Sequence, residues 1–366
     1  MNKILHFLII FAFLGCATKT SIDKPTKSMD NDEIITNAEF IKEKISSKGF
    51  GVKFFGDSHT ASGDLVLAFR DEFFGQDSVD SVGFVPALMP KYHSHSLVKF
   101  TQDGFEIISS RTEQNPDFPL CGVIATAKNG ASIDINLKKF KGKFGVEILH
   151  KFDKKDVIFE LKDAGGKSYK ILQKTPNSWE YSTFLLEFPI KISALKAGAQ
   201  IGGYKIYKNS GFVDACATNG AYSTISAKWA QSAWSRDFKG FDYKLFVIAY
   251  GTNDALDRDF SEQKFTKSIK ALMDKLRKNS PNAKFVLVSP PPSPKVKKAN
   301  LASSALKKLA KKENAIFVDI KTLIDSDGGW AKWQKMGLIR KDNIHFSHEG
   351  YAKIGKFIAQ KVKEKM

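Results

Sequence analysis

The sequence predicts an α/β domain whose parallel sheet is covered by helices on both faces and is interrupted by an inserted β-sandwich. Strand and helix patterns alternate before residue 98 and again after residue 208, as in parallel sheets with crossover helices. Between these limits the helical periodicity fades, and short strand-like runs recur between clusters of Gly, Asn, Asp and Lys. We therefore expect one split α/β domain, 33–97 and 209–366, around an insert at 98–208.

The first α/β part holds one helix, one strand and a second helix. Apolar residues at helical spacing predict a helix over 33–47, and the apolar run at 51–55 predicts the first buried strand. A helix over 61–74 is expected after the turn Gly56-Asp57-Ser58. This order places Ser58 at the carboxyl end of the first strand.

The insert is expected to contain only strands. Aromatic side chains in these runs are interpreted as core, with stacking on sugar rings as the minority alternative. The expected strands are 105–108, 122–127, 132–137, 145–150, 157–161, 169–172, 183–188 and 203–207.

After residue 209 the strand and helix alternation returns. Ser261 is a predicted N-cap, and apolar side chains after it follow a helical spacing. The expected strands are 212–215, 244–249, 284–289 and 315–320, and the expected helices are an Ala- and Trp-rich one after 221 and those at 261–279, 300–314 and 350–365.

The N-terminal sequence has the pattern of an export signal. Residues 1–16 join a short positive start to an apolar run that is too short to span a bilayer comfortably. Gly15-Cys16 resembles the bacterial lipobox, which implies lipidation of Cys16; a plain signal peptide with an incidental cysteine is the alternative. Ala17 after the cysteine implies the inner leaflet of the outer membrane, and the polar stretch 17–32 is expected to be a flexible tether.

Charge and cysteine content narrow the possible partners. The formal net charge of +18 suits an anionic polymer or membrane surface, although a lysine-rich proteome explains it equally well. An exported chain without a nucleic-acid motif argues against a nucleic-acid partner. Beyond Cys16 there are two cysteines, Cys121 and Cys216, which either pair or remain two buried thiols. Neither a Cys-based zinc site nor another metal or organic cofactor is expected.

Four distant segments place polar residues where the strands of the predicted sheet end. Ser58 follows the first strand, Gly220 the strand at 212–215, and Asn253 the strand at 244–249, while Asp342 and His345 precede the last helix. Open parallel sheets bind ligands at this edge, so these residues are expected to meet there.

This set of residues predicts nucleophilic catalysis by a serine. Ser58 needs a base, which His345 supplies, and Asp342 three residues earlier is positioned to orient the imidazole. Asp342 as a solvated loop acid and Ser58 as a mere helix cap are the alternative interpretations. The backbone N–H groups of Ser58 and Gly220 and the side-chain amide of Asn253 are the expected donors to the oxyanion.

The chain resembles the SGNH (GDSL-type) hydrolases. The resemblance rests on four ordered segments, namely GDS at Ser58, ACATNGA around Gly220, GTND at Asn253 and DNIH ending at His345. It implies a flavodoxin-like sheet and a Ser-His-Asp triad. Three stretches, 56–60, 327–338 and 345–351, further resemble bacterial peptidoglycan O-acetylesterases.

That narrower resemblance implies an exported, lipid-anchored periplasmic esterase. Its substrate would be O-acetylated peptidoglycan glycan strands, from which it removes the acetyl group on the C6 hydroxyl of N-acetylmuramic acid. One alternative is an SGNH esterase or acetyltransferase acting on another acetylated glycan or a small ester, because fold does not fix substrate. A second is a non-catalytic glycan-binding lipoprotein in which the insert binds sugar.

Overall fold

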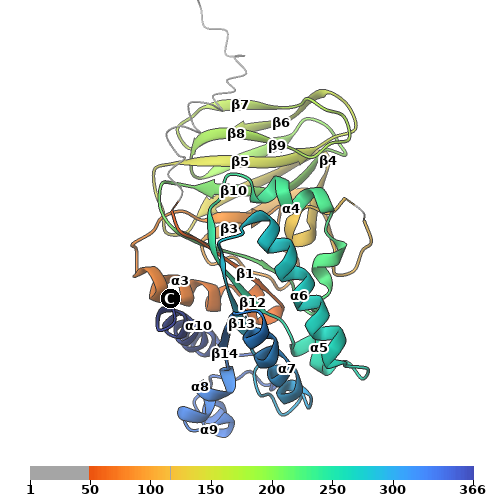
Figure 1. The fold of residues 1–366 in the computed structure, drawn as a ribbon. Coiled ribbons are helices and arrows are strands. Elements are labelled where there is room, and N and C mark those ends of the chain that lie inside the picture. The colour runs from red at the N-terminus through yellow and green to blue at the C-terminus, as the bar shows by residue number, and fades with distance from the viewer. Residues whose placement is uncertain (1–48, 116) are drawn as a thin grey trace, which may run out of the picture. The chain divides into compact units, whose positions relative to one another are not determined.

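The computed structural model describes residues 49–115 and 117–366 (Figure 1). The predicted signal segment, Cys16, the tether at 17–32 and the helix at 33–47 lie outside the described residues. The described chain contains two sheets, one parallel and one antiparallel. The predicted fold class, a parallel α/β sheet interrupted by an inserted β domain, is therefore confirmed.

The parallel sheet has five strands, and β1 lies second in it, between β11 and β12. Every neighbouring pair runs parallel. This arrangement brings the carboxyl ends of β1, β11 and β12 to one edge of the sheet. The strand order is β11 (Phe212–Ala217), β1 (Gly51–Gly56), β12 (Tyr243–Ala249), β13 (Lys284–Val288) and β14 (Ile316–Val318).

Helices cover both faces of this sheet. In β1 the side chains alternate, so that Val52 and Phe54 pack on one face and Phe55 on the other. The first face holds α3 (Asp64–Phe74), α8 (Ile320–Ser326), α9 (Trp330–Lys335) and α10 (His348–Lys363), and the second holds α4 (Gln231–Phe238), α6 (Glu262–Asn279) and α7 (Ala299–Lys312). In the described part of the chain no helix combines the length and the apolar character needed to cross a membrane.

The helix expected over 61–74 is two helices. A short turn, α2 (Ser58–Ala61), starts at the candidate nucleophile, and α3 begins only at Asp64. Gly63 between them has φ of 81°, which is outside the helical region. The break leaves Ser58 at the first position of its own short helix, directly above the end of β1.

The insert forms one continuous antiparallel sheet of nine strands. Its two outermost strands, β7 and β8, contact each other, so the sheet nearly closes around an apolar core. It also takes in β2, which precedes residue 98 and pairs with β10. The strands are β2 (Gly83–Pro86), β3 (Val98–Ser109), β4 (Val123–Leu137), β5 (Lys143–Lys151), β6 (Asp156–Lys162), β7 (Ser168–Gln173), β8 (Glu180–Glu187), β9 (Ile190–Ala194) and β10 (Gln200–Tyr207).

A buried ion pair joins β2 to the parallel sheet. The Lys53 ammonium on β1 lies 2.7 Å from the Asp214 carboxylate on β11, and both side chains are fully buried. The second oxygen of Asp214 accepts the backbone N–H of Phe84 on β2 at 2.7 Å and the Tyr243 hydroxyl at 2.6 Å. Every polar atom of the carboxylate is therefore engaged, which offsets the cost of burying the charges.

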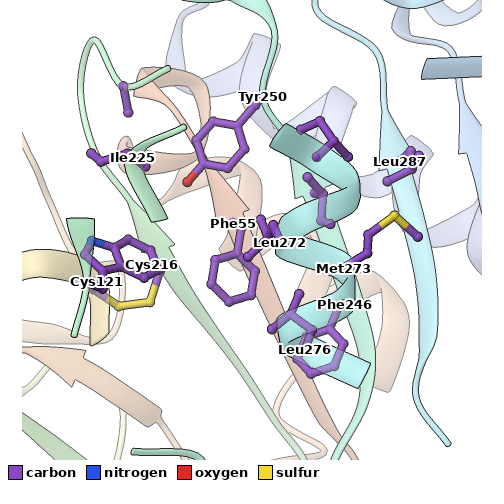
Figure 2. Close-up of a cluster of buried hydrophobic side chains, with 14 of the residues drawn as sticks. Phe55, Cys121, Cys216, Ile225, Phe246, Tyr250, Leu272, Met273, Leu276 and Leu287 are labelled. Carbon is purple, nitrogen blue, oxygen red and sulfur yellow. A yellow bond between two sulfur atoms is a disulfide. The ribbon is translucent and has the colours of Figure 1, made fainter. Parts of the chain in front are cut away.

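A disulfide makes a second, covalent connection. Cys121, in the short helical turn Leu120–Gly122, is bonded to Cys216 on β11 (Figure 2). The pairing that the sequence left open is thus present in the structure. Because Cys216 lies four residues before Gly220, the bond fixes the strand that leads into the candidate oxyanion turn.

Replacing both cysteines by serine is expected to lower the free energy of unfolding by about 2–5 kcal/mol. The bond closes a segment with a sequence separation of 95 residues, and its loss enlarges the unfolded ensemble. Urea unfolding of the oxidised wild type and of the Cys121→Ser/Cys216→Ser variant measures this difference. A reductant should bring the wild type to the variant's stability and leave the variant unchanged; equal stability under oxidising conditions would contradict the expectation.

Candidate active site

Ser58 is held at the carboxyl end of β1 by a tight turn. The N-cap of α2 is Asp57, whose carboxylate accepts the backbone N–H of His59 at 3.1 Å, so Ser58 itself does not cap the helix. A Cβ atom on Gly56 would lie 2.1 Å from the Thr60 hydroxyl, which only glycine avoids. The Ser58 side chain is left free to face the cleft.

The structure brings Ser58, His345 and Asp342 into one hydrogen-bonded chain. Ser58 Oγ lies 2.8 Å from His345 Nε2, and His345 Nδ1 lies 2.8 Å from Asp342 Oδ2. These distances match a nucleophile that donates to a base and a base that donates to an orienting carboxylate. The two segments are 287 positions apart in sequence, and α10 packs against α3 to bring them together.

The Asp342 carboxylate is held by backbone N–H groups of its own loop. Its Oδ1 accepts the N–H groups of Ile344 and His345, each at 2.9 Å. Burial raises the pKa of Asp342, but these two N–H groups and the His345 ring outweigh it, and the pKa lies below its ordinary value. The carboxylate side chain remains 46% exposed. Asp342 is therefore an ionised acceptor at neutral pH, with solvent access.

The expected oxyanion donors line the same cleft. Ser58, Gly220 and Asn253 all border a cleft of about 540 Å³ together with His345. Asn253, on α5 (Thr252–Leu256), donates one amide hydrogen to the Ala221 carbonyl at 3.0 Å, which leaves its other hydrogen for a ligand. Within residues 49–115 and 117–366, the backbone N–H groups of Ser58 and Gly220 donate to no other atom.

The backbone conformation of Gly220 favours glycine, and the side chain of Arg111 lies close to it. The φ of Gly220 is 69°, in the left-handed region, and a Cβ atom there would lie 2.9 Å from the guanidinium nitrogens of Arg111. Arg111 follows β3 of the insert. A residue of the insert thus covers the turn that carries a candidate oxyanion donor.

Several residues around the site were not assigned from the sequence. Asp254 accepts the N–H and the hydroxyl of Ser223, and so ties α5 to the segment after Gly220. Four other cleft residues lie on connections whose folding the sequence pattern does not specify, namely Tyr92, Ser94, Asn219 and Arg340. Thr252 and Leu256 border the cleft from α5, and Tyr351 borders it from α10. Of these residues, Asp254 was the one that the sequence could have indicated, because it follows Asn253 in the GTND motif.

His59 is buried beside the pair formed by Ser58 and His345. Its ring centroid lies 5.3 Å from that of His345, and its Nδ1 lies 3.1 Å from the Tyr351 hydroxyl. Burial, with a smaller contribution from the nearby His345, lowers the pKa of His59 to about 3. His59 is therefore neutral at physiological pH and places no second positive charge beside His345.

The other loop histidines bind backbone groups. His93 Nε2 accepts the N–H of Asn219 at 3.0 Å, and His95 Nδ1 accepts the N–H groups of Leu97 and Val98. Among the described residues no three potential metal ligands gather in one place. The pair that the sequence shows at positions 93 and 95 thus contributes hydrogen bonds to the fold.

Asp57 gives the protein a predicted pH dependence of stability. Burial raises the pKa of Asp57 to about 7, against the lowering effect of the His59 N–H. The folded state keeps this proton up to about pH 7, whereas the unfolded chain loses it near pH 4. Between these values the folded state binds more protons, so the free energy of unfolding falls as the pH rises.

Asp57→Asn is expected to remove this decrease in the free energy of unfolding between pH 4 and pH 7. The amide oxygen still accepts the His59 N–H, and the variant should exceed the wild type in stability above pH 7 by at most about 4 kcal/mol. Below pH 4 the difference should disappear. Urea unfolding at pH 4, 6 and 8 measures it, with Asp103→Asn on an exposed strand position as the matched loss of charge. Identical slopes in Asp57→Asn and wild type would refute the assignment.

Two family models match the chain. The model of the GDSL-like lipase/acylhydrolase family matches residues 199–353, which include Gly220, Asn253, Asp342 and His345. Residues 199–353 therefore form a GDSL-like lipase/acylhydrolase domain. The model of the peptidoglycan O-acetylesterase N-terminal domain matches residues 81–191, most of the antiparallel sheet of this hydrolase. These two matches indicate that the protein is a carboxylic ester hydrolase. Ser58 precedes both matched ranges and is placed by geometry.

One solved structure supports the fold of this hydrolase. A structure titled "Peptidoglycan O-acetylesterase in action, 5 min" shares 20% identity with a TM-score of 0.76, covering 89% of this chain and 93% of that one. Family two carbohydrate esterases from Clostridium thermocellum (12% identity, TM-score 0.35, 73% and 98% covered) and Cellvibrio japonicus (7%, 0.31, 73% and 98%) are more distant. Scores this low do not establish a shared fold. No curated protein matches the chain.

Proposed function

We propose that this GDSL-type hydrolase is a serine esterase that removes O-acetyl groups from the C6 hydroxyl of N-acetylmuramic acid in peptidoglycan. The observation that carries the chemistry is the pair of 2.8 Å contacts linking Ser58, His345 and Asp342 beside free N–H donors. The chemistry proposed requires no metal or organic cofactor.

The first half-reaction transfers the acetyl group to the enzyme. Ser58 Oγ attacks the acetyl carbonyl carbon while His345 Nε2 accepts the hydroxyl proton. The carbonyl oxygen becomes an oxyanion. It accepts hydrogen bonds from the backbone N–H groups of Ser58 and Gly220 and from the side-chain amide of Asn253. The intermediate then breaks its bond to the sugar oxygen, which takes the proton back from His345 and leaves as the C6 hydroxyl.

The second half-reaction releases acetate. A water molecule gives a proton to His345 Nε2 and attacks the acetyl carbon bound to Ser58. The same donors stabilise the second oxyanion, and its collapse returns the proton to Ser58 Oγ. Asp342 accepts the His345 Nδ1–H throughout, which keeps Nε2 available as the base and stabilises the imidazolium.

The substrate is inferred from the insert as well as from the site. Residues 81–191 match the model of the peptidoglycan O-acetylesterase N-terminal domain, and the fold is like that of a structure bearing the same enzyme name. Arg111 from the insert lies over Gly220, so the insert reaches the candidate oxyanion turn itself. An insert in that position is suited to hold a polymer while one of its acetyl groups enters the cleft.

The proposed location is the periplasm, with a lipid anchor at Cys16 in the inner leaflet of the outer membrane. A disulfide between Cys121 and Cys216 fits an oxidising compartment, where such bonds persist. Membrane fractionation of wild type and Cys16→Ser tests the anchor. A variant that stays in the membrane fraction to the same extent would contradict it.

The test of the function is acetate release by the purified protein from O-acetylated peptidoglycan, with the same peptidoglycan after chemical de-O-acetylation as the blank. An aryl acetate is assayed in parallel, and Ser58→Ala is the inactive control on both substrates. We expect serine-dependent acetate release from the O-acetylated polymer, with mass spectrometry of its muropeptides locating the loss at N-acetylmuramic acid.

Other outcomes separate the alternatives. Hydrolysis of the aryl acetate without release from peptidoglycan would favour an esterase for another acetylated glycan or a small ester. Transfer of the acetyl group to an added sugar would favour an acetyltransferase. Inertness on both substrates together with binding to peptidoglycan would favour a non-catalytic glycan-binding lipoprotein.

A further inference from the structure

The connection between β2 and β3 holds the Asn219–Gly220 turn at two points. The backbone N–H of Asn219 donates to His93 Nε2 at 3.0 Å. The side-chain amide of Asn219 donates to the Tyr92 carbonyl, also at 3.0 Å. Tyr92 has φ of 67°, unusual for a bulky residue, in the loop that presents this carbonyl. Asn219 is therefore pinned through its backbone and through its side chain.

The hydrogen bonds of His93 define its tautomer. Its Nδ1 lies 3.2 Å from the Lys91 carbonyl, which can only accept, so Nδ1 carries the proton. Nε2 is then an unprotonated acceptor, as the N–H of Asn219 requires. Burial lowers the pKa of His93, and the nearby Arg111 guanidinium lowers it further, against the Lys91 and Pro90 carbonyls. The neutral acceptor is thus the form present at neutral pH.

The pinned residue controls a catalytic donor. The peptide that follows Asn219 carries the N–H of Gly220, one of the proposed oxyanion donors. Gly220 has φ of 69° and, as glycine, moves through backbone conformations that other residues avoid. Fixing Asn219 on the preceding side limits the rotations by which this N–H can turn away from the cleft.

We propose that His93 is a positioning residue for the oxyanion hole: it accepts the Asn219 N–H and thereby aims the Gly220 N–H at the reacting carbonyl. This inference rests on the proposed function, because it assumes that Gly220 stabilises an oxyanion. It assigns the β2–β3 connection, which leads into the insert, a part in catalysis that is separate from holding the polymer.

A purely structural role would look different. His93 is half-buried in a surface connection, and it contacts Asn219 and its own loop. Its loss as a packing residue would lower stability and leave the transition state as well bound as before. A positioning role instead lowers kcat while KM stays near its original value, since the oxyanion exists only in the transition state.

His93→Gln and His93→Met provide a matched pair of variants. The Gln side chain places an oxygen acceptor close to the position of Nε2, whereas Met has similar length and offers only a weak acceptor. On an aryl acetate we expect His93→Met to lose about tenfold or more in kcat with KM within twofold, below the 10²–10³-fold of a donor lost outright. His93→Gln should stay within about threefold of the wild type.

A boronic acid inhibitor that forms a tetrahedral adduct with a serine supplies the second readout. Its affinity should fall by the same factor as kcat in His93→Met and recover in His93→Gln, at unchanged thermal stability. The inference would be overturned if His93→Met kept the kcat and the inhibitor affinity of the wild type. It would also be overturned if His93→Gln and His93→Met lost kcat and inhibitor affinity equally. An inactive wild type on the aryl acetate would instead overturn the proposed function itself.

Discussion

Ser58→Ala is expected to reduce kcat for acetate release by about 10⁴- to 10⁶-fold while leaving the fold intact. In the proposed mechanism the Ser58 hydroxyl forms the acetyl intermediate, and its Oγ lies 2.8 Å from the base, His345 Nε2. Without this hydroxyl, water must attack the substrate directly, and the residual rate comes from the oxyanion donors and substrate binding. Acetate release and urea unfolding of wild type and variant measure the two effects.

Ser62→Ala is the matched control for this prediction. Ser62 lines the same cleft, and its hydroxyl donates to the His59 carbonyl at 3.1 Å, away from His345. Its loss should change kcat by less than about fivefold, the scale of one ordinary hydrogen bond. An organophosphonate should label the wild type and Ser62→Ala and not Ser58→Ala. Retained activity in a folded Ser58→Ala protein would refute the nucleophile assignment.

The parallel sheet was predictable because its strands are buried on both faces. The runs at 51–55, 244–249 and 284–289 are mostly apolar, with Lys53 as the one charge inside a run, and each is followed by a turn or a helix signal. The break at Gly63 was missed because apolar spacing continues through it, although the chain turns there. The short helices α8 and α9 were missed as well, since six or seven residues carry too little periodicity.

Most strands of the insert could be predicted from the sequence, but their pairing into one sheet could not. The expected strands at 122–127 and 132–137 are one long strand, β4, and β9 was not anticipated. Which strands pair depends on contacts far apart in sequence. For the same reason the sequence could not show that β2 joins this sheet through β10.

The residues of the candidate site that could be predicted are those that lie in recognisable sequence motifs. Ser58, Asp342 and His345 lie in short motifs whose order indicates their roles. His93 and Arg111 lie in no motif. His93 on the β2–β3 connection and Arg111 after β3 reach the Asn219–Gly220 turn through tertiary packing, which the sequence pattern does not specify. The pairing of Cys121 with Cys216 likewise depends on the packing of the insert against β11.

Asp342→Asn is expected to lower kcat by about 10²- to 10⁴-fold with the fold retained. The amide oxygen can still accept the N–H groups of Ile344 and His345, so the loop keeps its shape. The amide NH₂ would then face His345 Nδ1 and favour the tautomer with the proton on Nε2, which cannot accept the Ser58 proton. Because the carboxylate is 46% exposed, solvent screens part of its effect on the imidazolium, and the loss should fall short of that for Ser58→Ala.

A charge-matched control and a double variant separate this role from a general electrostatic one. Asp325→Asn removes an exposed carboxylate of α8 that pairs with Lys321, and it should leave kcat unchanged. Adding Asp342→Asn to Ser58→Ala should cost little further activity, because the carboxylate acts only through His345 on the serine. Wild-type kcat in Asp342→Asn, or a further loss in the double variant as large as in the single one, would contradict the triad. Either result would mean that Asp342 braces its loop through the Ile344 and His345 N–H groups and that His345 serves Ser58 without it.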